Sequence, residues 1–158
     1  MNSRIATQTR AFAHTPTGID LAWASGFADG EACIHIARQI YVDPARRDTF
    51  RMRFAITQNH LAVLREFERS VAVVGRIYQL KRDDSQNRDC FQLVYDGDLA
   101  FTVIERIAPY LRRKQHEAKA ALAFRTICHI NRRFGRNGCP AEIWKLREGY
   151  YRKLQALK

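Results

Sequence analysis

The stretch Ala24-Ser-Gly-Phe-Ala-Asp-Gly-Glu-Ala32 carries the most specific pattern in the sequence. Its first residues place small side chains along a predicted helix, which lets another backbone approach closely. Two acids then flank Gly30, where the helix is predicted to stop because glycine adopts a left-handed backbone at little cost. This pattern has two interpretations: a helix that packs in its own core and is followed by a solvated glutamate, or a helix that presents acids at a functional site.

The net charge of the chain helps to decide between these two interpretations of the helix. Its 158 residues include 27 Lys and Arg against 16 Asp and Glu, a formal net charge of +11. The length is typical of one domain that can bury a core. An excess of positive charge favours a polyanionic partner, most commonly nucleic acid, although a basic protein without such a partner is the alternative. On a surface that binds phosphates, an acid weakens binding unless it holds a cation.

Composition also excludes some classes of protein. No apolar run approaches the roughly 18 residues that cross a bilayer, so no membrane partner is expected. Residues 1–17 are basic, rich in Thr and Ala, and lack the apolar core of a secretion signal, so we expect a flexible basic tail. The four cysteines show no Cys-x-x-Cys spacing, which predicts neither a zinc site nor a disulfide framework. An intracellular protein is expected, with cytoplasmic and organellar locations both open.

The rest of the chain predicts alternating helices and hairpins in one domain, residues 18–158. Thr17 and Asp20 have the spacing of a capping box at the start of a helix. Residues 51–57 alternate strictly between apolar and polar side chains, which is the strongest strand signal. The other predicted elements are a strand at 33–41, a helix at 61–74 ended by Gly75, strands at 76–80 and 90–95, a helix from Asp98 to about 107, a helix from Pro109 to about 130, and a helix opened by Pro140. The order is α-β-β-α-β-β-α-α-α, an α+β fold.

The stretch 24–32 resembles the LAGLIDADG motif of homing endonucleases, and the resemblance extends over roughly residues 18–130. It implies the αββαββα fold of that family, with an antiparallel DNA-binding sheet and here with extra C-terminal helices. In the family the motif helices pack together at a twofold or pseudo-twofold axis. Because this chain carries one motif, the resemblance implies a homodimer that binds a near-palindromic double-stranded DNA site. The interface side chains implied are Ala22, Ser25, Gly26 and Asp29.

The resemblance also assigns catalytic roles by position. Glu31 matches the last acid of the motif and is expected to bind the catalytic metal, with the backbone carbonyl of Gly30 as a further ligand. Asp29 matches the more structural acid, which caps the helix end. Gln58 is the candidate that orients the attacking water, and Lys114 is the candidate basic residue of the pocket. Without the family match, Gln58 reads as a strand-end turn residue and Lys114 as part of a solvated helix face.

Oxygen ligands and a phosphate substrate favour Mg²⁺ as the divalent cation. The metal is expected to polarise the scissile phosphate and to activate a water molecule for hydrolysis of the phosphodiester bond. Two positions depart from the family pattern: Ala32 replaces the final glycine of the motif, and Ala62 stands where some relatives carry an arginine near the active site. Arg65 is a candidate to supply that missing charge.

Those departures keep two other functions open. One is an RNA-binding intron maturase, which helps splicing and has kept the fold but lost cutting. The other is a DNA-binding regulator without catalysis. The joint presence of Glu31, Gln58 and Lys114 favours the endonuclease, because binding alone does not need these three residues.

The alternating strands predict which side chains face DNA. Arg suits guanine and Gln suits adenine in the major groove. The candidates for the sheet face are His35, Ala37, Gln39, Tyr41, Arg51, Arg53, Ala55, Thr57, Arg76, Tyr78 and Gln92. Basic side chains in the predicted loops are expected to contact phosphates, which position the protein without specifying sequence. These are Arg46, Arg47, Lys81, Arg82 and Arg88. A strand of about ten residues spans ~33 Å, so a dimer is expected to cover on the order of 20 bp.

Overall fold

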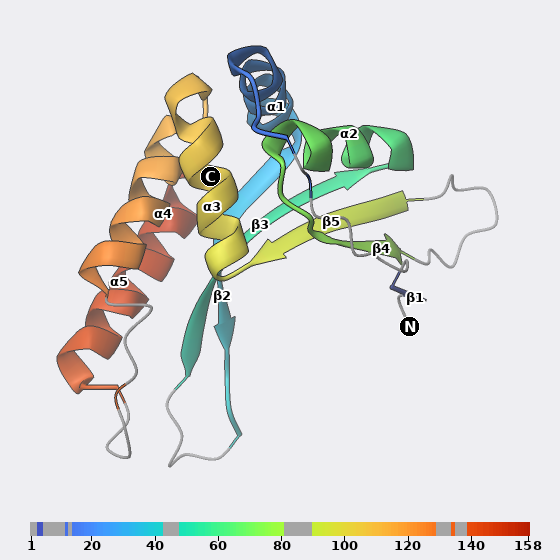
Figure 1. The fold of residues 1–158 in the computed structure, drawn as a ribbon. Helices are drawn as coiled ribbons and strands as arrows, with labels where there is room; N and C mark the ends of the chain where they lie inside the picture. Colours follow the sequence, from blue (N-terminus) through green and yellow to red (C-terminus); the bar gives the residue numbers. More distant parts are fainter. Residues whose placement is uncertain are drawn as a thin grey trace.

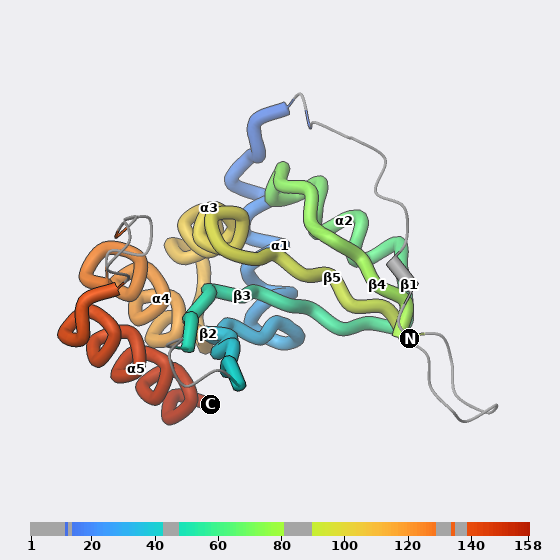
Figure 2. Tube along the Cα trace, turned by 90° about the horizontal axis from the view of Figure 1, so that it is seen from below, coloured from blue at the N-terminus to red at the C-terminus, as the bar shows by residue number. Residues whose placement is uncertain are grey.

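The structure, a computed structural model, describes residues 3–4, 12, 14–42, 48–80, 90–128, 134 and 139–158. It has an α+β architecture, in which a curved antiparallel sheet carries helices on one side (Figure 1). The other face of the sheet is left uncovered by helices, as the view turned by 90° makes clear (Figure 2). Within the described residues, no helix is both long enough and apolar enough to cross a membrane.

The sheet has the strand order β1-β4-β5-β3-β2, and every neighbouring pair is antiparallel. Its main strands are β2 (Ala32–Gln39), β3 (Thr49–Gln58), β4 (Arg76–Leu80) and β5 (Cys90–Asp96). The two-residue strand β1 (Ser3–Arg4) pairs with the outer edge of β4. These two residues belong to segment 1–17, for which we predicted a flexible basic tail.

The alternation seen in the sequence appears directly in the strand register. Ile34 pairs with Phe54 on the face toward the helices, and the adjacent pair His35 and Arg53 lies on the opposite face. The two faces differ because successive side chains of a strand point to opposite sides. The prediction of one apolar and one polar face is therefore confirmed.

Five helices follow the predicted order. They are α1 (Gly18–Glu31), α2 (Leu61–Val71), α3 (Asp98–Ile107), α4 (Gln115–Ile127) and α5 (Ala141–Ala156). The predicted capping box is present: the Thr17 N–H donates to the Asp20 carboxylate at 2.8 Å, and the Asp20 N–H donates to the Thr17 hydroxyl at 3.2 Å. α1 runs through Gly30 rather than stopping there, so Glu31 is the last helical residue.

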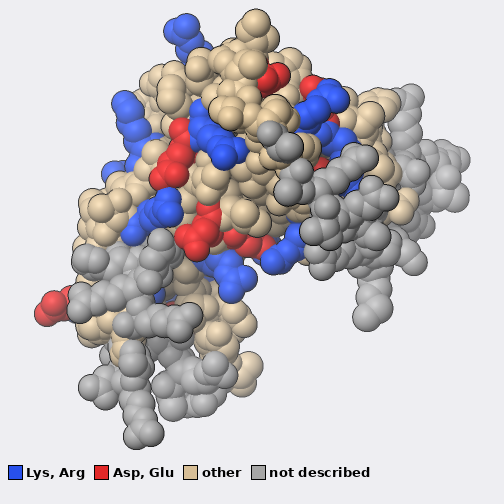
Figure 3. Space-filling model, viewed as in Figure 1, with Lys and Arg blue, Asp and Glu red and all other residues tan. Residues whose placement is uncertain are grey.

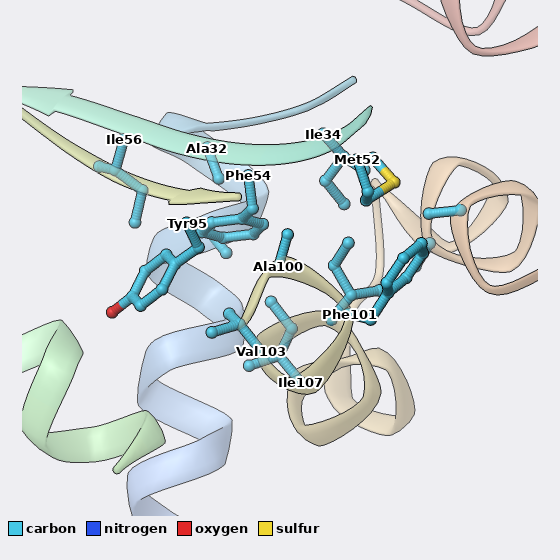
Figure 4. Packing of buried hydrophobic residues seen from close by; sticks show 14 of the residues in the cluster. Ala32, Ile34, Met52, Phe54, Ile56, Tyr95, Ala100, Phe101, Val103 and Ile107 are labelled. Atoms are coloured by element: carbon cyan, nitrogen blue, oxygen red, sulfur yellow. The ribbon is translucent and has the colours of Figure 1, made fainter. Parts of the chain in front are cut away.

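The core lies between the sheet and helices α1 to α4. Phe54 of β3 stacks on Phe67 of α2 at a ring-centroid distance of 5.7 Å, and both are fully buried with Tyr95 of β5. Figure 4 shows side chains of the sheet, among them Phe54 and Met52, pointing toward Ala100, Val103 and Ile107 of α3. This packing fixes the sheet against α1 and so positions the end of the motif helix.

The predicted helix boundaries differ from the structure in three further places. Gly97 rather than Asp98 is the N-cap of α3. The helix predicted to start at Pro109 is interrupted: Ala108–Tyr110 form a 3₁₀ helix, and α4 begins only at Gln115. α2 ends at the left-handed residue Ala72 (φ 49°), not at Gly75. The interruption before α4 matters for the site, because it frees backbone N–H groups there.

The C-terminal helix α5 packs with only part of its apolar surface. Leu154 is buried and Tyr150 packs against the core, whereas Leu146 is 43% and Leu157 is 37% exposed. Aromatic residues add to the contact, since Phe50 of β3 lies 5.8 Å from the Trp144 ring and 5.9 Å from the Tyr151 ring. α5 therefore supports the helix-facing side of the β2–β3 hairpin.

Gly75 is buried where the chain enters β4, and its missing side chain is what allows it to fit. A Cβ atom there would lie 2.5 Å from Leu93 Cδ1 and 2.9 Å from Tyr95 Cε1, and both side chains are fully buried. We expect Gly75→Ala to lower the free energy of unfolding by about 1–3 kcal/mol through overpacking, as measured by urea denaturation. Gly149→Ala in α5, where the new Cβ meets no atom within 4 Å, is the control and is expected not to destabilise. Equal stability of the two variants would contradict the packing argument.

Candidate nuclease site and DNA-binding face

Glu31 occupies the junction between the motif helix and the sheet. It is the last residue of α1, and Ala32 begins β2 directly after it. The side chain is exposed and makes no hydrogen bond or ion pair with any residue that the structure describes. No group of three or more His, Cys, Asp or Glu side chains that could hold a metal is found in the described segments. Glu31 thus offers an exposed carboxylate at this junction.

Asp29 connects the motif helix to the segment just before α4 through hydrogen bonds. Its carboxylate accepts hydrogen bonds from the backbone N–H groups of Arg112 (2.7 Å), Arg113 (3.2 Å) and Lys114 (2.9 Å). Partial burial acts to raise the pKa of Asp29, but these backbone bonds outweigh it and leave the pKa below its usual value. Asp29 therefore ties the end of the motif helix to the backbone of residues 112–114, the segment that leads into α4.

Lys114, the candidate basic residue of the pocket, contacts the end of the motif helix. Its Nζ donates to the backbone carbonyl of Asp29 at 2.5 Å, and Arg113 Nε donates to the same oxygen at 2.8 Å. Cations suit a helix C-terminus because its last carbonyls carry partial negative charge. Lys114 is 6% exposed, and burial, followed by the charge of Arg113, lowers its pKa from the ordinary lysine value. The Lys114 ammonium group is therefore bound to the carbonyl of the residue before Gly30, two residues before Glu31 in the sequence.

Gln58 lies at the same end of the sheet as Glu31. Ala32, the first residue of β2, pairs with Ile56 of β3, and Gln58 lies two residues after Ile56 at the end of β3. Its Oε1 accepts a hydrogen bond from the Asn59 N–H at 3.3 Å, which orients the side chain locally. Glu31 at the end of α1, Gln58 at the end of β3 and Lys114 at the start of α4 are thus brought to the same end of the sheet.

Arg65, the candidate to supply the missing charge, has an ion-pair partner within its own helix. Arg65 Nη1 pairs with Glu68 at 2.8 Å, and Glu68 is a buried residue whose other carboxylate oxygen accepts the Gly75 N–H at 2.8 Å. A buried carboxylate needs such partners, because an unpaired charge in the interior is costly. Part of the charge of Arg65 is therefore used within α2.

The uncovered face of the sheet carries most of the side chains predicted to read DNA. Strand register places ten of them on that face: His35, Ala37, Gln39, Arg51, Arg53, Ala55, Thr57, Arg76, Tyr78 and Gln92. Tyr41 lies beyond the end of β2 at Gln39, so strand alternation does not place it there. Ala55 is only 7% exposed and offers little contact area. The loop residues Arg46, Arg47, Lys81, Arg82 and Arg88 lie outside the described residues.

His35 sits among cations on this face. Burial lowers the pKa of His35 below its usual value, and the charges of Lys158 and Arg53 act in the same direction. The influence of Lys158 agrees with the position of the C-terminus beside β2 (Figure 2). A neutral imidazole has one donor and one acceptor nitrogen, so His35 can contact either kind of group on a base edge.

One acid on the same face was missed by the sequence analysis. Asp96 is the last residue of β5 and pairs in register with Arg53. The signal was present, because alternation from Gln92 through Val94 puts Asp96 on the face of Gln92. Figure 3 shows basic and acidic side chains lying beside one another around the hollow on the lower side of the molecule.

The motif helix has one stripe of its surface that the described residues leave exposed. Ile19 is 84% and Trp23 is 40% exposed, and Ala22 and Gly26 are exposed beside them. A Cβ atom built on Gly26 would meet nothing within 4 Å. Ser25 does not belong to this stripe, contrary to our prediction: it is fully buried, and its hydroxyl donates to the carbonyl oxygens of Leu21 at 2.7 Å and Ile107 at 3.0 Å.

Comparison with known proteins defines the fold. No protein-family model and no curated protein matches this sequence. Among solved structures, the chain is similar to the homing endonuclease I-CvuI in complex with DNA, with a TM-score of 0.67 and 20% identity over 89% of this chain and 82% of that one. It is also similar to I-Vdi141I, an archaeal intron-encoded homing endonuclease complexed with DNA (TM-score 0.66, 18% identity, 89% of this chain and 84% of that one).

A third similar structure is larger. The LAGLIDADG homing endonuclease I-GzeII in complex with its DNA target matches with a TM-score of 0.58 and 14% identity, over 90% of this chain but 44% of that one. The I-CvuI complexes were obtained in the presence of magnesium or calcium. The chain therefore has the LAGLIDADG homing-endonuclease fold, and the resemblance that the sequence carried is confirmed at the level of fold.

Proposed function

We propose that this protein is a site-specific endonuclease that hydrolyses both strands of DNA with a divalent metal, preferably Mg²⁺, as a homodimer. The observation that carries the proposal is the position of Glu31. An exposed carboxylate stands at the end of the motif helix, where β2 of the basic sheet face begins, and two residues after Asp29, whose carbonyl accepts from the buried ammonium of Lys114. A DNA-binding surface has little use for such an acid unless it holds a cation.

The residues at this position fit a hard divalent cation. The Glu31 carboxylate and the backbone carbonyl of Gly30 would hold it, and both offer the oxygen ligands that Mg²⁺ prefers. When bound, the metal would stabilise negative charge on the scissile phosphate and lower the pKa of bound water. Gln58 would orient water at the same edge, and Lys114 would add positive charge near the phosphate while holding the Asp29 carbonyl.

Two observations support the homodimer. The exposed stripe of α1, defined by Ile19, Ala22, Trp23 and Gly26, is apolar and lined by small residues, which suits close packing against a second copy. This chain also matches 44% of I-GzeII, about half of that larger chain. A second copy would supply a second Glu31, so that each strand of the duplex meets one carboxylate.

A specific observation also favours a second candidate, a DNA-binding regulator with the same fold. Ala62 lacks a charge, and Arg65 is held by Glu68, so the pocket has fewer cations than the family pattern implies. A third reading, an RNA-binding maturase, makes the uncovered face a site for structured RNA. All three functions use the basic face, and they differ in whether Glu31 takes part in chemistry.

Selection from a randomised pool of duplex DNA distinguishes the three functions. The full chain is incubated with the pool in Mg²⁺, and cleaved and bound molecules are sequenced separately. We expect cleaved, near-palindromic sites on the order of 20 bp. Specific binding in Mg²⁺ without cut ends would contradict the endonuclease and support the regulator. Retention of structured intron RNA in preference to every duplex in the pool would support the maturase.

A further inference from the structure

Asp96 is an acid on the sheet face that is otherwise basic. It ends β5, and its side chain is 10% exposed. Arginines from two neighbouring strands cover its carboxylate: Arg53 Nε lies 2.8 Å from Oδ1, and Arg76 Nη1 lies 3.7 Å from Oδ2. A carboxylate here reduces the attraction of the face for phosphates. Its position between two arginines indicates that it acts on them rather than on the DNA backbone.

The contact with Arg53 has the geometry of a fixed pair. Two bonds run in parallel, from Nε to Oδ1 at 2.8 Å and from Nη2 to Oδ2 at 3.3 Å. The two residues are directly opposite in the β3–β5 ladder. The backbone beside Asp96 is fixed as well, because the Gly97 N–H donates to the Met52 carbonyl at 2.9 Å. Both sides of the pair are thus held by the sheet.

Arg51 provides a contrast on the same strand and the same face. It is exposed, and it makes no ion pair with an acid in the described part of the chain. Its long side chain keeps its rotamer freedom and can follow either a base or a phosphate. Arg53 has less freedom, and a group held in place before binding loses less entropy when it binds.

The pair leaves Arg53 able to contact a base. Asp96 engages the Nε edge of the guanidinium, so the Nη1 N–H groups and the second Nη2 N–H are not used by it. The Arg53 side chain remains 39% exposed. A hollow beside it is lined by Arg53, Tyr78, Gln92, Val94 and Asp96. The free edge of a guanidinium matches the O6 and N7 acceptors of guanine in the major groove.

We propose that Asp96 is a specificity-determining positioning residue, which holds Arg53 so that its free edge reads a guanine at one symmetric pair of positions in the DNA site. The inference rests on the proposed function, because it requires that this face meets the major groove. Asp96 itself contacts no base. It makes Arg53 selective by fixing its direction and by reducing its attraction to phosphates.

The test is a binding selection on duplex DNA without cleavage, in Ca²⁺, with the full chain. Asp96→Ala is expected to reduce the preference for guanine at one symmetric pair of positions by roughly 5- to 150-fold, the range for loss of one bidentate contact. Affinity for unrelated DNA should hold or rise, because a negative charge has been removed. Asp96→Asn, which keeps the shape and one acceptor, should fall between wild type and Asp96→Ala. Arg51→Ala is the matched control and should change a different pair of positions.

A double-mutant comparison separates positioning from direct readout. In an Arg53→Ala background, Asp96→Ala should change the preference at that pair of positions no further. A preference for cytosine that depends on Asp96 in both backgrounds would overturn the proposal, since Asp96 would then read the base itself. An unchanged profile in Asp96→Ala would also overturn it while leaving the proposed function intact. A wild-type chain that selects no sequence at all would overturn both.

Discussion

Replacing Glu31 with Gln is expected to reduce metal-dependent DNA cleavage by several orders of magnitude while leaving the fold unchanged. The amide has nearly the size of the carboxylate, and Glu31 is exposed without a described partner that the substitution could disrupt. What each site loses is the anion proposed to hold the metal. That stabilisation acts on the transition state rather than on docking, so the loss appears in the cleavage rate. Single-turnover cleavage of a selected site in Mg²⁺ measures it.

Binding provides the second readout for the same variant. Affinity for the selected site without metal should hold or increase in Glu31→Gln, because a negative charge near phosphate has been removed. Glu142→Gln, which neutralises an exposed acid in the first turn of α5, is the control and should cleave at the wild-type rate. If Glu31→Gln still cut at a near wild-type rate, the active site would lie elsewhere. The regulator and maturase readings assign Glu31 no chemistry and predict no difference between cutting and binding.

Local patterns were sufficient to predict the scaffold. The Thr17 and Asp20 capping box, the alternation in 51–57 and the apolar stripe in 61–74 each depend on residues close in sequence. Such patterns report which side chains share a face, because the periods of helix and strand are fixed by backbone geometry. The observed register, with His35 opposite Arg53, follows from the same alternation. The strand residues that lie on the uncovered face of the sheet could therefore be named from the sequence.

Contacts between distant segments were not predictable in this way. Asp29 binds backbone N–H groups more than 80 residues away, and these are free only because the chain is interrupted between Tyr110 and Gln115. The sequence predicts a continuous helix there, since Pro109 is compatible with a first helical turn. The partner of the Asp29 carboxylate is therefore set by tertiary packing rather than by neighbouring residues.

Replacing Gly26 with Leu is expected to separate the two chains of the proposed dimer and to abolish cutting with it. In a single chain the position is open, since a Cβ atom there meets nothing within 4 Å, so the monomer should fold. Between two motif helices the leucines would fill the space that close packing requires. Overpacking costs about 1–3 kcal/mol per copy, so two copies should weaken the dimer by roughly 30-fold or more. Sedimentation velocity over a range of concentrations measures the change.

Gly149→Leu is the matched control for this variant, because it makes the same substitution at another exposed helical glycine with open space around it. Its sedimentation and cutting should equal those of wild type. Gly26→Leu should also bind a half-site and a full site with similar affinity, because a monomer gains nothing from the second half. Gly26→Leu keeps Glu31, so a loss of cutting in this variant would show that the Glu31 carboxylate of a single chain is not sufficient. A wild-type chain that stays monomeric on its selected site, or a Gly26→Leu chain that stays dimeric and active, would contradict the two-chain site.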